Sequence, residues 1–329
     1  MKNNNSFLLT VEDLKLNFYG ADKVSHVLNG ISYTVKPGET VCLVGESGCG
    51  KTVSALTIMG LIPQPPGKIM GGKVFFKGEN ILDLDQDEMQ KIRGKSIGMV
   101  FQEPMTSLNP VLTIGEQIGE AVILHLKLDK NDSLSKTVEL LGEVGIPSPE
   151  KIVGQDPHQL SGGQRQRIMI ALALACNPEL VIADEPTTAL DVTIQAQILK
   201  LFEELQQKRN MSLIYITHDL GVVASIADRI YIMYSGLIFE QGSTNDILYN
   251  SRHPYTRGLL ASLPDRSKRG RSIHSIPGTV PDPSRTPSGC PFHPRCTSSI
   301  DDCGGVFPEL GDYGNGHLSR CPVLFAQEK

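Results

Sequence analysis

Eight consecutive residues fit the pattern G-x-x-x-x-G-K-[ST]: Gly45, Glu46, Ser47, Gly48, Cys49, Gly50, Lys51 and Thr52. An apolar stretch that reads as a strand, residues 39–44, precedes them, and a helical stretch, residues 53–59, follows. The glycines let the backbone curl so that successive N–H groups point inward, and the new helix N-terminus adds partial positive charge. This unit indicates an α/β fold. It predicts polyphosphate binding, with Lys51 at the outer phosphates and Thr52 as a magnesium ligand, where the alternative is a glycine-rich turn with a surface lysine.

Length and charge limit the classes of protein that remain. A chain of 329 residues is long for one domain, which predicts two unequal domains or one domain with an appendage. The net charge of −5 argues against nucleic acid as a partner, because surfaces that bind nucleic acid are basic. No apolar run approaches the ~18 residues of a membrane span, and residues 1–6 do not begin a signal peptide. We therefore expect a cytosolic chain that reaches a membrane only through a partner.

Two further features flank the loop in the sequence. Alternating apolar residues before it indicate strands, and either Phe18 or Tyr19 is placed to stack on a purine base, unless both pack the sheet. After it, the apolar strand at residues 97–101 ends in Gln102, a residue type that can ligate magnesium and respond to a γ-phosphate. From residue 113 to 145 the apolar residues repeat with helical spacing, which predicts a small helical subdomain inserted in the α/β core.

A second glycine-rich motif, Leu-Ser-Gly-Gly-Gln at residues 160–164, begins another predicted helix. Ser161 is placed to cap that helix, but Gly162 and Gly163 in its first turn lower helix stability. This loss makes sense if a phosphate approaches the backbone amides there. One nucleotide needs only one phosphate-binding loop within a chain, and residues 45–52 already supply it. We therefore predict that the second motif, including Gln164, contacts a nucleotide held by another subunit.

Two acidic residues, Asp184 and Glu185, end the apolar strand that begins at residue 180, and open parallel sheets place their active residues at such carboxyl ends. We predict that Asp184 holds magnesium, commonly through water, and that Glu185 polarises or deprotonates a water that attacks the γ-phosphate. The alternative is a pair of solvated acids. A further strand, residues 212–216, leads to His218, which either orients Glu185 and the γ-phosphate or has a structural role.

Taken in chain order, these motifs resemble the full set of ABC-type ATPase domains: the loop at 45–52, Gln102, the motif at 160–164, Asp184-Glu185, Ala189-Leu190-Asp191 and His218. The likeness spans roughly residues 8–260. Other stretches resemble the ATP-binding subunits of bacterial oligopeptide/dipeptide importers, namely residues 105–110, 187–197, 253–256 and 290–296. Cys49 stands where that family frequently has serine, and we expect its alkylation to block ATP binding and ATP to protect it.

The resemblance implies an α/β fold, a P-loop ABC-type ATPase domain with a RecA-like core, an antiparallel β subdomain and a helical subdomain at about residues 103–176. This domain would occupy residues 1–260, and residues 261–329 would form a small Cys-rich extension. ATP hydrolysis coupled to transport would use Lys51, Glu185 and His218 as catalytic residues and Thr52, Gln102 and Asp184 at magnesium. The remaining nucleotide contacts would come from the loop and from Tyr19, Ser161, Gly162, Gly163, Gln164 and Asp191.

The resemblance also implies partners. Two ATPase subunits, this chain and a similar but different one, or two copies of this chain, would close head to tail around two ATP molecules. They would act on two transmembrane permease subunits at the cytoplasmic face of the bacterial inner membrane, and an external binding protein would deliver di- or oligopeptides. Nickel importers share much of the pattern, so nickel or another small solute is one alternative. A soluble non-transport ABC ATPase is another.

The region from residue 276 to 322 is rich in proline and glycine, which favour turns. So many turn residues leave too few apolar side chains for the region to form a stable core of its own. Four of the seven cysteines lie there, and clustered cysteines in a cytosolic chain indicate a metal before disulfides. Their spacing leaves zinc, an iron–sulfur site and unligated thiols open, and the family resemblance favours a [4Fe–4S] cluster. These cysteines are Cys290, Cys296, Cys303 and Cys321, and a predicted solvated linker precedes them with Arg266, Lys268, Arg269 and Arg271.

Overall fold

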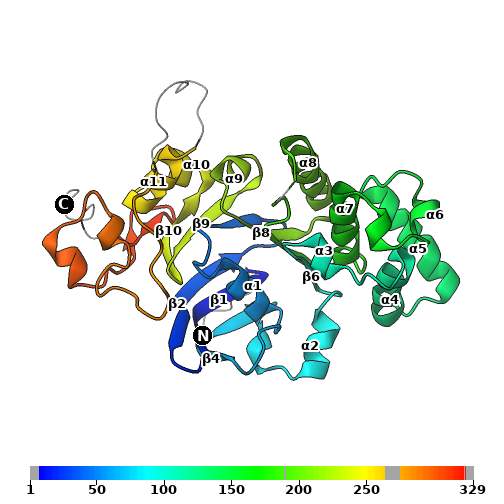
Figure 1. Ribbon diagram of the computed structural model, residues 1–329, viewed down its shortest axis with the longest axis horizontal. Helices are drawn as coiled ribbons and strands as arrows, with labels where there is room; N and C mark the ends of the chain where they lie inside the picture. The colour runs from blue at the N-terminus through cyan, green and yellow to red at the C-terminus, as the bar shows by residue number, and fades with distance from the viewer. Residues whose placement is uncertain (1–6, 189, 264–274, 322, 324–329) are drawn as a thin grey trace. The chain divides into compact units, whose positions relative to one another are not determined.

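The computed structural model describes residues 7–188, 190–263, 275–321 and 323 (Figure 1). The chain forms two compact units: residues 1–35, 40–82 and 217–329 in the first, and residues 36–39 and 83–216 in the second. The predicted basic linker, the first six residues and Ala189 lie outside the described part. Within that part, no helix is both long and apolar enough to cross a membrane.

The first unit contains an antiparallel sheet of four strands in the order β2-β1-β4-β5, which confirms the expected antiparallel β subdomain. Alternation is visible around the middle of β1, where Leu14 and Leu16 are fully buried while Asp13 and Lys15 are exposed. Leu9 of β1 lies opposite Val35 of β2 and Phe76 of β4, which fixes the register on both sides. The strands are β1 (Leu9–Tyr19), β2 (Val24–Val35), β4 (Gly67–Phe76) and β5 (Glu79–Asn80).

A second group of strands in this unit carries the phosphate-binding loop. β3 (Thr40–Val44) is buried along its whole length and pairs in parallel with β9 (Arg229–Tyr234), as a continuous apolar run predicts. β10 (Leu237–Ser243) pairs antiparallel with β9 and with β12 (Leu318–Ser319), which also pairs with β11 (Gly311–Asp312). The cysteine-rich extension therefore adds strands to this sheet. The helices of the unit are α1 (Lys51–Ile58), α9 (Leu220–Ile226), α10 (Thr244–Tyr249) and α11 (Pro254–Ala261), with short 3-10 turns at Ile81–Asp83, His293–Arg295 and Asp301–Gly304.

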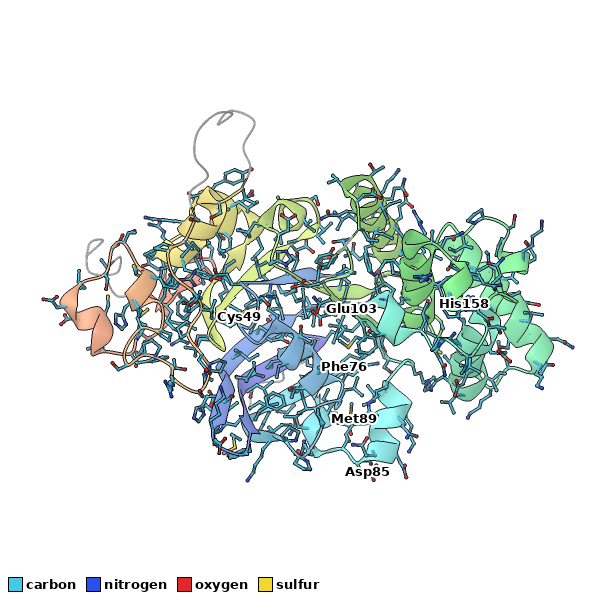
Figure 2. The ribbon with its side chains drawn as sticks, viewed as in Figure 1. Cys49, Phe76, Asp85, Met89, Glu103 and His158 are labelled. Atoms are coloured by element: carbon cyan, nitrogen blue, oxygen red, sulfur yellow. The ribbon has the colours of Figure 1, made fainter. Side chains whose placement is uncertain are left out.

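The second unit contains a parallel group of strands, β6 (Ile97–Val100), β7 (Leu180–Asp184) and β8 (Ser212–Thr217). Its first helix, α2 (Gln86–Ile92), begins with a capping box in which Asp85 accepts from the Glu88 N–H and Glu88 accepts from the Asp85 N–H. Figure 2 shows Asp85 at this end of α2 and Met89, which is buried, one turn further along. The remaining helices are α3 (Pro104–Ser107), α4 (Ile114–Leu126), α5 (Lys130–Glu143), α6 (Pro149–Ile152), α7 (Gly162–Ala173) and α8 (Val192–Arg209), with a 3-10 turn at Pro157–Gln159.

The helical region expected between residues 113 and 145 is present as two helices, α4 and α5. The break has a local cause, because Lys127 ends α4 with a left-handed φ of 59° and Asp129 then caps α5 by accepting from two backbone N–H groups. Thr113 and Glu116 form a capping box at the start of α4. Figure 1 shows α4, α5 and α6 gathered beside α7 in the same unit.

Candidate functional site

The phosphate-binding loop joins β3 to α1 within the first unit. A Cβ atom at Gly45 would stand 2.2 Å from the main-chain oxygen of Met233 and 2.8 Å from the sulfur of Cys49, so only glycine fits there. Gly48 and Gly50 have φ values of 81° and 103°, which strain any residue with a side chain. The backbone path of the loop therefore requires these glycines, in agreement with the curl that the motif predicts.

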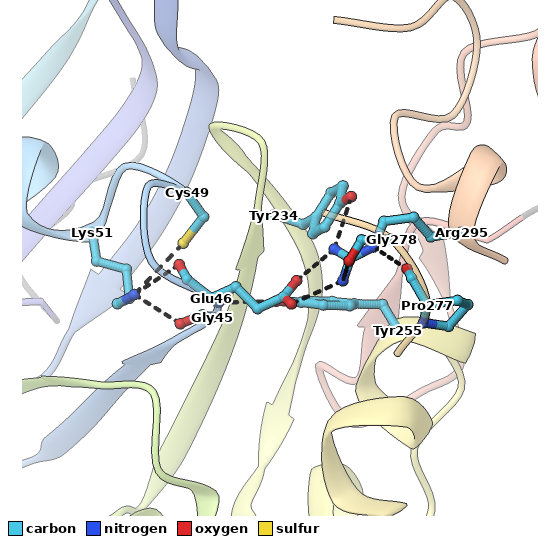
Figure 3. A network of polar contacts seen from close by, with 9 residues as sticks. All are labelled: Gly45, Glu46, Cys49, Lys51, Tyr234, Tyr255, Pro277, Gly278 and Arg295. Atoms are coloured by element: carbon cyan, nitrogen blue, oxygen red, sulfur yellow. Dashed lines mark hydrogen bonds and ion pairs between the residues drawn. The ribbon is translucent and has the colours of Figure 1, made fainter. Parts of the chain in front are cut away.

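Lys51 begins α1 and is only 5% exposed. Its ammonium donates to the main-chain oxygens of Gly45 at 2.7 Å and Glu46 at 3.1 Å and lies 3.8 Å from the sulfur of Cys49 (Figure 3). The lysine charge is thus held inside the ring of the loop, and the alternative of a surface lysine is wrong. Thr52 is half-buried in the first turn of the same helix.

Cys49 is fully buried in this loop. Burial raises the pKa of its thiol, and the nearby charge of Lys51 only partly offsets that effect. A thiol that is inaccessible and protonated reacts slowly, because the thiolate is the nucleophile. Burial therefore argues against ready alkylation of Cys49, whereas the block of ATP binding by alkylation and the protection by ATP stay predictions.

In the second unit, Gln102 and Glu185 lie together. Strands β6 and β7 pair in parallel, so their carboxyl ends meet at one edge of the sheet. The amide of Gln102 donates to a carboxylate oxygen of Glu185 at 3.4 Å, and the hydroxyl of Thr188 donates to the same oxygen at 3.0 Å. Asp184, at the end of β7, is only 2% exposed. The contact joins Gln102 to Glu185, two of the residues predicted to act at the γ-phosphate and magnesium, and Asp184 directly precedes Glu185 in the chain.

The backbone of Glu185 is strained. Its φ is 44°, a left-handed value that is uncommon for a residue other than glycine. Its N–H donates at 2.9 Å to the main-chain oxygen of Ile216 in β8, which fixes the residue against the neighbouring strand. Such strain costs about 1–3 kcal/mol and clusters at functional sites. The strain favours a chemical role for Glu185 over a solvated strand end.

The second glycine-rich motif forms the capped start of α7. Ser161 accepts from the Gln164 N–H at 3.3 Å, and the Gln164 side chain accepts from the Ser161 N–H at 3.0 Å. A Cβ at Gly162 would meet nothing within 4 Å, and one at Gly163 would make ordinary contact with Ile194. Internal packing therefore leaves room for side chains at both glycines. This room agrees with the prediction that something outside the chain approaches them.

The other predicted site residues are placed as follows. Asp191 caps α8 by accepting from the Ile194 N–H at 2.9 Å. His218 is exposed and follows β8, in a part of the chain that belongs to the first unit. Tyr19 is 42% exposed at the end of β1, with its hydroxyl 3.4 Å from the sulfur of Met70, so its ring remains available for stacking.

The four late cysteines lie near one another in the first unit. Cys290, Cys303 and Cys321 are buried, Cys296 is partly exposed, and none of them is in a disulfide. Burial raises the pKa of Cys290 to about 11; the Phe292 N–H partly offsets this effect, and the charges of the other three cysteines add to it. Yet among the described residues no three His, Cys, Asp or Glu side chains converge closely enough to hold one metal ion.

Sequence reasoning missed one set of contacts entirely. Glu46, in the phosphate-binding loop, forms an ion pair with Arg295 of the extension, with the closest atoms 2.6 Å apart (Figure 3). The Glu46 N–H also donates to the hydroxyl of Tyr255 at 3.0 Å. Arg295 and Tyr255 lie within stretches that resemble importer subunits, but neither was given a role. One sequence feature could have indicated this contact: Arg295 lies between Cys290 and Cys296, in a region too rich in turns to form its own core. Such a region needs contacts with the rest of the chain.

Known families match this chain in two places. A family model described as ABC transporter matches residues 28–188, and one described as the C-terminal region of oligopeptide/dipeptide transporters matches residues 239–303. The probable peptide ABC transporter ATP-binding protein y4tR of Sinorhizobium fredii is 49% identical over 95% of this chain and 94% of its own. The dipeptide transport protein DppD of Bacillus subtilis is 47% identical with the same coverage. OppD, the oligopeptide transport protein of that species, is 52% identical over 89% of this chain and 82% of its own.

Solved structures agree with these matches. A dimeric ATP-binding cassette, MJ0796, bound to ADP and Pi, superimposes with a TM-score of 0.65 and 29% identity over 72% of this chain and 98% of its own. CbiO1 from Clostridium perfringens, part of an ABC transporter complex, superimposes with a TM-score of 0.62 and 28% identity over 74% of this chain and 90% of its own. The chain therefore belongs to the family of ABC-type ATPases that are the ATP-binding proteins of oligopeptide/dipeptide ABC transporters.

Proposed function

We propose that this chain binds and hydrolyses ATP to energise the import of di- or oligopeptides through a membrane ABC transporter. The observation that carries the proposal is the loop between β3 and α1, whose glycines are required by the backbone and whose Lys51 is held inside it. The relatives named for peptide, dipeptide and oligopeptide transport support the choice of solute. Nickel or another small solute remains the alternative.

In the proposed mechanism, the loop amides and Lys51 bind the phosphates of ATP. Thr52, Gln102 and Asp184 would hold magnesium, which would offset the charge that builds up on the phosphates. Glu185 takes a proton from a water that attacks the γ-phosphorus in line with the bond to ADP, and ADP and phosphate leave. His218 orients the γ-phosphate and Glu185. The hydrogen bond from Gln102 to Glu185 supports this assignment, because it links the carboxylate to the residue proposed to respond to the γ-phosphate.

A second ATPase subunit completes each site in this proposal. The ATP bound by the partner is contacted by Ser161, Gly162, Gly163 and Gln164. Asp191 lies near this interface between the two subunits. The open space at Gly162 supports this role, as does the likeness to a dimeric cassette. The partner is a similar but different subunit, or a second copy of this chain, and Tyr19 stacks on the adenine.

Two permease subunits are the other proposed partners, with this chain attached peripherally at the cytoplasmic face of the bacterial inner membrane. The second unit offers an open groove of about 790 Å³ that is mainly apolar. Ile123, Leu124 and Leu134 line it and are 40%, 55% and 50% exposed, although large apolar residues are normally buried. We propose that a permease subunit contacts this groove, while an external binding protein selects the solute.

We also propose that Cys290, Cys296, Cys303 and Cys321 hold a [4Fe–4S] cluster, with zinc and unligated thiols as the alternatives. The proposal rests on the family resemblance and on four neighbouring cysteines that form no disulfide. In this arrangement the extension from residue 261 onward would be a module stabilised by its cluster, beside an ATPase domain at residues 1–260 with a helical subdomain at about residues 103–176. Iron and sulfide analysis of the protein purified without oxygen tests the assignment.

The function is tested with Glu185→Gln, which keeps the size of the side chain and removes the proton acceptor. We expect the purified variant to bind ATP and lose turnover, and cells carrying it to lose uptake of labelled di- and oligopeptides. Glu203→Gln, an exposed position of α8, is the matched control. Loss of nickel uptake instead of peptide uptake would move the chain to metal import. Unchanged uptake of both, or near-normal hydrolysis in the variant, would contradict the proposal.

A further inference from the structure

Arg295 links the extension to the phosphate-binding loop. It lies in the 3-10 turn His293–Arg295, between Cys290 and Cys296 in the sequence, and is only 6% exposed. Its guanidinium forms two parallel hydrogen bonds with the carboxylate of Glu46, at 2.6 and 2.9 Å (Figure 3). A bidentate ion pair of this kind is stronger than one with a single hydrogen bond, and a lysine side chain cannot form it.

Residues of the extension and of β9 fix the position of this guanidinium. Its Nε donates to the main-chain oxygen of Pro277 at 2.7 Å, and one terminal nitrogen donates to the hydroxyl of Tyr234 at 3.2 Å. The group also lies over the rings of Tyr234 and Phe292, at 5.7 and 5.9 Å from their centres. Both aromatic rings are buried. The Arg295 guanidinium therefore keeps its position without the contact to Glu46. It can then hold the Glu46 side chain, and with it the loop, in one conformation.

Glu46 in turn is held at three places. Its carboxylate bonds Arg295, its N–H donates to Tyr255, and its main-chain oxygen accepts from Lys51. The conformation of the second residue of the loop thus depends on a side chain from the extension. Charge matters as well, because Glu46 places an anion within a loop that binds an anionic ligand.

We propose that Arg295 is a positioning residue for ATP binding, which neutralises the Glu46 carboxylate and fixes the second residue of the loop. This inference rests on the proposed function, since it requires the loop to bind ATP. Without Arg295, the unpaired carboxylate repels the phosphates and is free to turn toward them. The extension is then part of the nucleotide site of its own chain and not only an appendage.

The test measures the dissociation constants of fluorescent ATP and ADP analogues for the full chain and its variants. We expect Arg295→Gln to weaken ATP binding by about tenfold or more, and ADP binding by less, because ADP carries less negative charge. Arg295→Lys should fall between Arg295→Gln and the natural chain. Glu46→Gln should bind ATP at least as tightly as the natural chain, and Glu46→Gln combined with Arg295→Gln should recover most of the lost affinity.

Arg320→Gln is the matched control, because Arg320 also lies in the extension and donates to main-chain oxygens, those of Ile238 and Pro308, but does not bond the loop. Circular dichroism establishes that each variant is folded. Unchanged ATP affinity in Arg295→Gln, equal losses in Arg295→Gln and Arg320→Gln, or no recovery in the double variant would each overturn the inference. If the natural chain itself does not bind ATP, the proposed function fails first.

Discussion

The side chain of Glu240 is fully buried in β10 and ties three segments of the first unit together. Its carboxylate accepts from the backbone N–H groups of Arg252 at 2.5 Å and His253 at 3.0 Å, just before α11. It also accepts from Nε2 of His317 at 2.8 Å, next to β12 of the extension. Glu240→Ala removes all three acceptor contacts at once.

The size of the effect follows from burial. His253 and His317 are 2% and 5% exposed, so water does not readily replace the lost acceptor. Each buried donor left without a partner costs about 1–3 kcal/mol, so losing the common acceptor of three donors costs at least about 3 kcal/mol. We therefore expect Glu240→Ala to lower the free energy of unfolding by about 3–5 kcal/mol. For a domain of about 200 residues this corresponds to a fall in Tm of at least about 6 °C.

Thermal unfolding followed by circular dichroism checks this value. Glu240→Gln keeps one acceptor oxygen and the volume of the side chain, so its loss should be smaller than that of Glu240→Ala. Glu309→Ala, at an exposed position of the same extension, should change Tm by little. A fall in Tm of less than about 3 °C for Glu240→Ala would refute the reasoning, because it would show that the three donors find other partners.

Two further predictions concern titration and reactivity. Burial lowers the pKa of His253 to about 4, so the folded chain keeps it neutral while the unfolded chain protonates it near its usual pKa of about 6.5. Stability should therefore fall by up to about 3 kcal/mol as the pH drops from about 6.5 to 4, and plots of Tm against pH should be flatter for His253→Asn, which keeps a helix-capping side chain. Cys49 should react slowly with iodoacetamide with and without ATP and quickly once the chain is unfolded in denaturant, and rapid labelling of the folded chain detected by mass spectrometry would contradict its burial.

Local patterns in the sequence were enough to predict the elements that carry the site. The strand, loop and helix around residues 45–52 follow from consecutive residues whose backbone requirements are local, and the structure explains the glycines in those terms. The same holds for the capped start of α7 and for the strand that ends at Asp184, where capping residues and an apolar run mark the boundaries. Periodicity did not predict the break between α4 and α5, which depends on the backbone of Lys127 and the cap at Asp129.

The sequence by itself therefore determined the α/β ATPase fold, the phosphate-binding loop and the acidic strand end, because turn chemistry and hydrophobic runs act over a few neighbouring residues. Only the tertiary structure decided that Cys49 is inaccessible, that Glu240 anchors the extension and that Arg295 meets Glu46 across 249 positions of the chain. Such contacts leave no periodic trace, since each depends on how distant segments pack and which polar groups lose water together. The link between the extension and the loop is a property of that packing.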